Sequence, residues 1–169
     1  MLPLLITLSI TVLDQLTKLW VRADFVLGES REVIPGFFHL TYLRNPGAAW
    51  GMFGGHNTVL TLLSIVMLLV IFIFRRSFLS DTWEHRTALG LMAGGIIGNL
   101  MDRVRYGYVV DFLDFNIFGY GWPVFNVADT AICVGVGIYV VSSLWMSTHP
   151  LHDPQRTADR ESGADTKTE

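Results

Sequence analysis

The segment from Gly107 to Ile132 reads GYVVDFLDFNIFGYGWPVFNVADTAI and places two carboxylates, Asp111 and Asp129, in apolar surroundings. Asp111 lies in a run of β-branched and aromatic residues, whereas Asp129 lies at the start of a long apolar segment. Ionisable groups next to or inside the hydrocarbon layer are energetically unfavourable and usually mark a functional site. Two carboxyl groups brought together share one proton, which suits them to hydrolyse a peptide bond. This segment therefore predicts a membrane-embedded aspartyl peptidase.

The composition agrees with an integral membrane protein. Hydrophobic residues make up 51% of the 169 positions, and the mean hydropathy is +0.43. They are gathered into blocks long enough to cross a bilayer, which takes about 20 residues. We expect a membrane α-helical fold with four transmembrane helices, at about residues 2–22, 58–74, 87–106 and 124–146. The net charge of −3 provides no basic surface for nucleic acid.

The two long connections, residues 24–57 and 107–123, are too polar and too broken by Gly and Pro to cross a membrane. Residues 33–43 are rich in β-branched and aromatic residues and predict short strands around a turn at Pro35-Gly36. The second connection alternates like a strand and ends in a predicted turn at residues 119–123. A small β-structure is therefore expected outside the helices.

Four spans place both termini and the connection between the second and third spans on one side of the membrane. Lys and Arg are equally numerous on the two sides, with six on each. Three of them, Arg75, Arg76 and Arg86, are concentrated in the short connection, and short loops dominate the positive-inside rule. That side is therefore predicted to be cytoplasmic. Residues 149–169 are polar and mixed in charge, so we expect a disordered cytoplasmic tail after a membrane domain of residues 1–148.

A polar stripe runs along the first span. Asp14 and Lys18 are four residues apart, so they share a helix face and can form an ion pair. Thr7 and Thr11 extend this face, which must then face protein rather than lipid. Two interpretations are open: a structural ion pair at the membrane boundary, with Lys18 reaching outward, or a contribution to the site.

The third span has small residues along its length and polar residues at its far end. Its glycines at positions 90, 94 and 98 have the spacing that allows helices to pack closely in lipid. Asn99 is expected to form hydrogen bonds inside the bundle. Asp102 and Arg103 share its face, and they suit either anchoring at the membrane boundary or a site.

Two other features are less specific. Residues 45–50 read NPGAAW, which favours a structural loop, although the small residues would also let a ligand approach closely. Cys133 is the only cysteine, which excludes an internal disulfide. We expect it to be a small buried apolar residue in the last span.

In this topology, polar residues from every segment lie near the same membrane surface, which is typical of a site. They are Asp14, Lys18, Asn45, Asn99, Asp102, Arg103, Asp111, Asn126 and Asp129. Asp129 also has a structural interpretation, because with Asn126 as N-cap it could fold back in a capping box. The same helix N-terminus favours negative charge. We therefore expect Asp129 to be ionised and to activate water, and Asp111 to hold the proton and polarise the scissile carbonyl.

Five motifs occur in an order typical of one protein family. They are DQLTK at 14–18, NPGAAW at 45–50, GGIIGNLMDR at 94–103, VVDF at 109–112 and FNVADTAI at 125–132. Each is weak alone, but together they resemble the bacterial lipoprotein signal peptidases, or type II signal peptidases, from the first span to the fourth.

The resemblance implies an aspartyl peptidase of the bacterial inner membrane, with Asp111 and Asp129 as its catalytic pair near the extracytoplasmic face. Its substrates would be prolipoproteins whose cysteine already carries diacylglyceryl, cleaved just before that cysteine. It also implies a small extracytoplasmic β-cradle and a lid-like helix over the four spans. Residues that match the family's substrate pocket are Asp14, Lys18, Asn45, Gly47, Asn99, Arg103, Asn126 and Ala128. We expect a monomer in the lipid bilayer that uses no cofactor and no metal, because the five histidines are scattered.

Two other functions are compatible with acids in a membrane. A proton- or ion-conducting protein would need polar residues through the whole thickness, and the second and third spans lack them in their middles. A non-catalytic assembly factor would use the glycine-rich third span to bind partner helices, and its acids would be dispensable.

Overall fold

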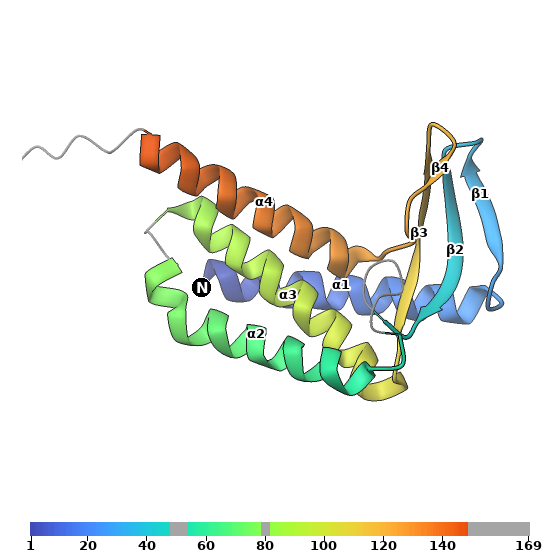
Figure 1. Cartoon of the computed structure of the whole chain (residues 1–169), viewed down its shortest axis with the longest axis horizontal. Helices are drawn as coiled ribbons and strands as arrows, with labels where there is room; N and C mark the ends of the chain where they lie inside the picture. The colour runs from blue at the N-terminus through green and yellow to red at the C-terminus, as the bar shows by residue number, and fades with distance from the viewer. Residues whose placement is uncertain (48–53, 79–81, 149–169) are drawn as a thin grey trace, which may run out of the picture.

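Four long helices and a small antiparallel sheet make up the part of the chain that the computed structural model describes, residues 1–47, 54–78 and 82–148 (Figure 1). The helices are α1 (Leu2–Asp24), α2 (Asn57–Phe78), α3 (Trp83–Tyr106) and α4 (Val127–Thr148). The strands are β1 (Ser30–Ile34), β2 (Phe38–Asn45), β3 (Val109–Ile117) and β4 (Tyr120–Gly121), in the order β1-β2-β3-β4. The sheet lies at one end of the bundle, and the start of α1 and the end of α4 lie at the other (Figure 1).

The bundle is apolar outside and polar inside. Leu16, Ile73 and Val141 are 59%, 67% and 68% exposed, whereas Asp14 and Asn126 are completely buried. This distribution is the reverse of that in a soluble domain and suits a lipid environment. By length and composition, α1 and α4 can each cross a membrane, and α2 contains a shorter apolar stretch, Asn57–Ile73. The number of spans remains a prediction.

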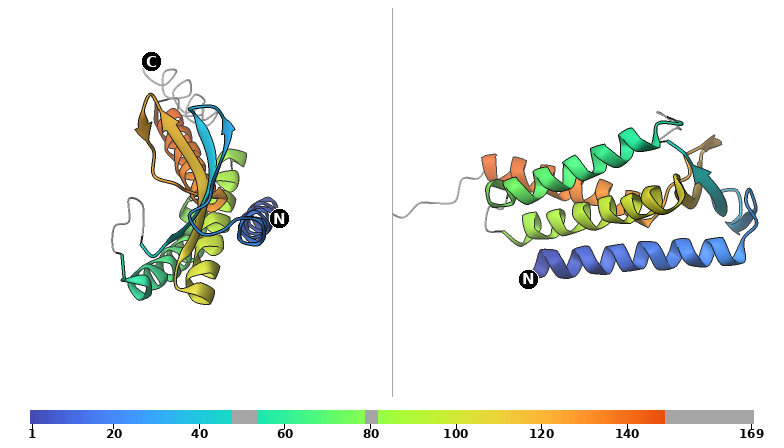
Figure 2. Two further views of the ribbon diagram at one scale, coloured as in Figure 1. Left: turned by 90° about the vertical axis from the view of Figure 1, so that its right-hand side faces the viewer. Right: turned by 90° about the horizontal axis from the view of Figure 1, so that it is seen from below.

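Helix α3 lies at the centre of the helical layer, with α1 on one side and α2 on the other (Figure 2). Glycines make the contact with α1 close. A Cβ at Gly90 would lie 2.8 Å from the Ile6 Cβ, and one at Gly94 would lie 2.9 Å from the Thr7 carbonyl oxygen. The predicted role of the glycine spacing in helix packing is therefore confirmed.

The polar stripe of α1 faces protein, as predicted, and the helix that it faces is α3. The Thr7 hydroxyl donates to the Gly90 carbonyl oxygen at 3.2 Å. The Thr11 hydroxyl, one turn further along α1, and the Gln15 side-chain amide, one turn after that, donate in the same way, again at 3.2 Å. Their acceptors are the carbonyl oxygens of Gly94 and Gly98. These bonds give the stripe partners that lipid cannot supply.

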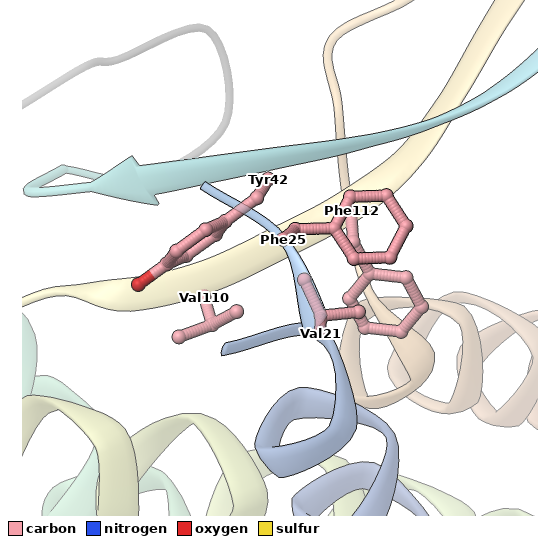
Figure 3. Packing of buried hydrophobic residues seen from close by; sticks show 5 residues of the cluster. All are labelled: Val21, Phe25, Tyr42, Val110 and Phe112. Atoms are coloured by element: carbon pink, nitrogen blue, oxygen red, sulfur yellow. The ribbon is translucent and has the colours of Figure 1, made fainter. Parts of the chain in front are cut away.

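The sheet is fixed to the end of α1 by a small apolar core (Figure 3). Val21 and Phe25 from the end of α1 pack against Tyr42 of β2 and against Val110 and Phe112 of β3. All five are at most 6% exposed. Burial of side chains of this size stabilises the contact by about 1.5–3 kcal/mol each. Asp111 lies between two members of this core, so the core also determines where its backbone lies.

Strand β3 also determines where α4 begins. Phe125 pairs with Leu113 through two hydrogen bonds, of 2.8 and 3.1 Å. The extended residues before α4 thus form one more pairing with the sheet. This pairing brings Asn126 beside Asp111, although 15 positions separate them.

Several predicted boundaries are wrong by a few residues. Helix α2 continues to Phe78 past positions 75 and 76, because arginine is a good helix former and does not end a helix. Helix α4 begins at Val127 rather than 124, because the residues before it pair with β3. The turn predicted at 119–123 lies at Phe118-Gly119, which have φ of 52° and 84°, as in a tight hairpin.

The short strands predicted in residues 33–43, around Pro35-Gly36, are confirmed by β1 and β2, and the predicted returning strand is confirmed by β3. The predicted tail, residues 149–169, and residues 48–53 of the connection 24–57 lie outside the described residues. The lid-like helix implied by the resemblance stays a prediction.

A methyl group at position 98 should destabilise the bundle. In Gly98→Ala the new Cβ would lie 2.5 Å from Asp14 Oδ2, and this carboxylate cannot easily move away because it is completely buried and bonded to Lys18 and to the Ala128 N–H. We expect the midpoint of thermal unfolding in detergent to fall. The control is Gly137→Ala on α4, whose Cβ would have no neighbour within 4 Å. Because alanine favours a helix by about 1 kcal/mol over glycine, this variant should be unchanged or slightly more stable. Equal stability of the two variants would contradict the close contact.

Candidate active site

A cleft of about 580 Å³ lies between α2, α3, α4 and β3, and both predicted carboxylates line it. Its walls are mostly apolar, with Met67, Ile96 and Val134 among them. The polar residues of the lining include Asn45, Asn99, Arg103, Asp111 and Asp129. A mostly apolar cleft with a few convergent polar groups is typical of a site that binds an apolar ligand in one orientation.

Asp111 is held by two amide donors. Asn126 Nδ2 donates to its Oδ1 at 2.7 Å, and Asn45 Nδ2 donates to its Oδ2 at 2.9 Å. Asn45 reaches it because β2 and β3 pair antiparallel, with Leu43 opposite Asp111. The carboxyl group is buried, and burial together with the negative charge of Asp129 raises its pKa to about 7. Near neutral pH, Asp111 can therefore hold a proton.

Asp129 lies in the first turn of α4, and its side chain faces α3. Asn99 Nδ2 donates to its Oδ1 at 2.7 Å. Its backbone N–H donates to Asn126 Oδ1 at 2.9 Å, so Asn126 caps the helix as predicted. The hydrogen bond of its carboxylate to Asn99 points the group toward the cleft rather than back to the cap, as a capping box would require.

Asn126 contacts both Asp111 and Asp129. Its amide nitrogen bonds Asp111, and its oxygen accepts from the backbone of Asp129. The same nitrogen lies 3.2 Å from Asn99 Oδ1 and 3.3 Å from the Val110 carbonyl oxygen. One completely buried side chain therefore bonds the carboxylate of Asp111 and the backbone of Asp129, which holds the start of α4 beside β3.

Behind the cleft, Lys18 forms a buried ion cluster. Its Nζ lies 2.9 Å from Asp14 Oδ2, 3.2 Å from Asp102 Oδ2 and 2.9 Å from Asn99 Oδ1. Lys18 is 2% exposed, so the interpretation in which it reaches outward is wrong. Asp102 is 1% exposed and accepts from the Val110 N–H at 3.0 Å, so it is not a boundary anchor. Both turn inward because α3 covers this face of α1.

The remaining predicted pocket residues divide into two groups. Asn45, Asn99 and Arg103 line the cleft, and Arg103 Nη2 also lies 3.4 Å from the Gly47 carbonyl oxygen. Asp14, Lys18, Gly47, Asn126 and Ala128 are buried and support the wall from behind. Their predicted direct contact with substrate is therefore not visible in the cleft lining.

Two residues were interpreted incompletely from the sequence. Gln15 donates to Asp102 Oδ1 at 3.1 Å and so joins the ion cluster. The spacing of Thr7, Thr11 and Gln15 by four residues was the signal that could have revealed it. Cys133 was expected to be buried, but it is exposed and lines the cleft, because it lies one turn after Asp129 on the same helix face.

Within the described ranges, no three His, Cys, Asp or Glu side chains are placed to hold a metal ion.

A comparison with protein families identifies the chain. The family model for signal peptidase (SPase) II matches residues 6–145. The chain belongs to this family. The resemblance predicted from the five motifs is thereby confirmed, and the family is one of peptidases.

Individual signal peptidase II relatives cover most of the chain. A lipoprotein signal peptidase from Moorella thermoacetica is 46% identical over 133 residues, which are 79% of this chain and 86% of that protein. One from Desulforapulum autotrophicum is 44% identical over 145 residues, covering 80% and 87%. A solved structure of a bacterial membrane enzyme has a TM-score of 0.81 and 36% identity, covering 89% of this chain and 92% of that one. The fold is therefore that of a membrane enzyme with helices and a small antiparallel sheet.

The raised pKa of Asp111 predicts how stability depends on pH. Between its ordinary value of 3.8 and about 7, the folded protein retains a proton on Asp111 that the unfolded chain has lost. The free energy of unfolding should therefore fall as the pH rises through this window, by at most about 1.4 kcal/mol per pH unit from this group. The Asp111→Asn variant should lack this contribution to the slope. Chemical unfolding in detergent at several pH values measures both proteins, and equal slopes would contradict the assignment.

The exposure of Cys133 predicts that a thiol reagent blocks the cleft. Modification by the membrane-permeant N-ethylmaleimide should fill the space below Asp129 and abolish peptidase activity. The Cys133→Ala variant should be active and insensitive to the reagent. Full activity after stoichiometric modification, measured by mass spectrometry, would show that this wall of the cleft does not meet substrate.

Proposed function

We propose that this chain is an aspartyl endopeptidase that removes the signal peptide from diacylglyceryl-modified prolipoproteins, cleaving just before the lipidated cysteine. The observation that carries the proposal is the pair of carboxylates that line one cleft, each held by an amide donor, with Asn126 bonded to the Asp111 carboxylate and to the Asp129 backbone. Membership of the signal peptidase II family and the names of its lipoprotein signal peptidase relatives support the choice of substrate.

In the proposed reaction, the two carboxyl groups hold one proton between them. Asp129 is the ionised partner: it removes a proton from a water molecule, whose oxygen forms a bond to the scissile carbonyl carbon. Asp111 begins protonated and gives its proton to the carbonyl oxygen as negative charge develops there. Collapse of the tetrahedral intermediate returns that proton to Asp111, breaks the C–N bond, and transfers the proton on Asp129 to the leaving amine. The raised pKa of Asp111 supports this assignment of roles.

The apolar walls of the cleft suit a substrate that is already in the bilayer. A signal peptide is an apolar helix, and its lipidated cysteine carries two further apolar chains. Side chains such as Met67 and Ile132 can contact these groups, while the amides of Asn45 and Asn99 are near enough to the carboxylates to bond substrate backbone. Arg103 is the cation of the cleft lining, and it suits the polar part of the glyceride or a backbone carbonyl.

We also propose that the protein works as a monomer in the bacterial inner membrane, with four spans and cytoplasmic termini. The cleft lining includes Asn45 of β2 and Asp111 of β3. The sheet lies at one end of the bundle (Figure 1), and this end would face the extracytoplasmic side. Water could then reach the carboxylates without crossing hydrocarbon. The ion-conducting alternative requires polar side chains along a whole path, and the cleft has its polar groups at one end and apolar walls elsewhere.

The proposed function is tested by removing each acid separately. Purified Asp111→Asn and Asp129→Asn variants should cleave a lipidated precursor at least about 100-fold more slowly than the wild type, because each loses a proton-transfer group. The change in precursor mobility on a gel measures cleavage. The matched control is Asp114→Asn on the same strand, whose carboxylate accepts from the Thr41 hydroxyl at 2.7 Å instead of lining the cleft. It should cleave at the wild-type rate.

Wild-type cleavage by either dyad variant would reject the aspartyl mechanism. Absence of cleavage by the folded wild-type protein would reject the peptidase proposal and favour the assembly-factor alternative.

A further inference from the structure

Lys18 is a buried cation that the proposed reaction does not use directly. Its ammonium has three donors, and the structure supplies three acceptors: one oxygen each from Asp14, Asp102 and Asn99. The cation therefore lies one side chain away from Asp129, because Asn99 bonds both. The arrangement of these partners indicates what the cluster does.

The orientation of the Asn99 amide follows from Lys18. A side-chain amide has an oxygen that accepts and a nitrogen that donates, whereas an ammonium can only donate. The oxygen of Asn99 must therefore face Lys18, at 2.9 Å, and its nitrogen then faces Asp129, at 2.7 Å. The opposite orientation would place two donors together and two acceptors together in a buried environment. Such contacts are strongly unfavourable.

The two acids of the cluster act on the backbone. Asp102 Oδ2 accepts from the N–H of Val110, the residue before Asp111, at 3.0 Å. Asp14 Oδ1 accepts from the N–H of Ala128, the residue before Asp129, at 3.0 Å. Each acid thus holds the backbone N–H of the residue that precedes Asp111 or Asp129.

We propose that Asp14, Lys18 and Asp102 form a positioning element for the carboxylate pair, in which Lys18 orients Asn99 toward Asp129 and the two acids hold the backbone before Asp111 and Asp129. This inference rests on the proposed function. It assigns Lys18 and Asp14 an indirect role, in place of the substrate contact implied by family resemblance. A buried ion cluster does not by itself stabilise a fold, because desolvation of the charges offsets their attraction. We therefore expect a change in the cluster to alter kcat, which reports the chemical step.

Kinetics of Lys18→Met test the positioning role. The variant keeps the length of the side chain but removes the charged donor, so the Asn99 oxygen keeps only its longer contact with Asn126 Nδ2, at 3.2 Å, and the amide is held less firmly. We expect kcat on a lipidated precursor peptide to fall about 100-fold, the effect of a small misplacement of a reacting group, while KM changes little. The matched control is Arg22→Met, one turn along the same helix, whose guanidinium stacks on the Tyr106 ring at 3.9 Å. It should keep the wild-type kcat and KM.

A second variant leaves the net charge of the cluster unchanged. Lys18→Met with Asp102→Asn removes one charge of each sign, and the new amide oxygen can still accept from Val110. This double variant should remain about 100-fold slower in kcat, because Asn99 still lacks the Lys18 donor. Wild-type kcat in the folded double variant would overturn the proposal, as would a rise in KM alone.

If both variants fail to fold, the isosteric Asn99→Asp variant tests the proposal in their place. It leaves Lys18 paired but cannot donate to Asp129. A large loss of kcat supports the proposal, and wild-type kcat overturns it. A folded wild-type protein that does not cleave the peptide would instead reject the proposed function, so the two failures are distinguishable.

Discussion

Hydrocarbon offers no hydrogen-bond partner, so a polar cluster inside a lipid-facing bundle must satisfy itself. In this protein that requirement produces one continuous network. It runs from Lys18 through Asn99 to Asp129, and through Asn126 to Asp111. Each amide in the network has its oxygen toward a donor and its nitrogen toward a carboxylate. The same bonds that make the cluster tolerable in a membrane therefore also orient the groups that carry the proposed chemistry.

Close approach of the helices makes this network possible. Side chains as short as aspartate and asparagine meet only if the backbones are near one another, and the glycines of α3 allow that. At Gly98 a single methyl group would contact Asp14, and at Gly95 it would contact the Ala128 carbonyl oxygen. The sheet supplies the other constraint. Its core with Val21 and Phe25 holds β3 on the end of the bundle, and its pairing with Phe125 delivers the start of α4 to the same place.

Several features of the site could be recognised from local patterns. Asp111 and Asp129 stand out as acids in apolar surroundings, and Asn126 three residues before Asp129 indicates a helix cap. Positions four apart identify the polar face of α1 and the packing face of α3. Such patterns reflect interactions within one segment, or the general rule that charges avoid lipid, and both can be evaluated without a fold. Element boundaries were less predictable, because the pairing of Phe125 with Leu113 shortens α4 by a contact between distant segments.

From the sequence alone came the class of protein, the two acids and the set of polar residues that accompany them. Periodicity and hydropathy determine which faces are polar, because they depend only on neighbours along the chain. Only the tertiary structure decided which partner each of these residues contacts and which of them line the cleft. Lys18 points inward to Asn99, Asp102 holds the peptide before Asp111, and Cys133 is exposed in the cleft. Each of these depends on which helix covers a given face, and that is settled by packing between segments far apart in sequence.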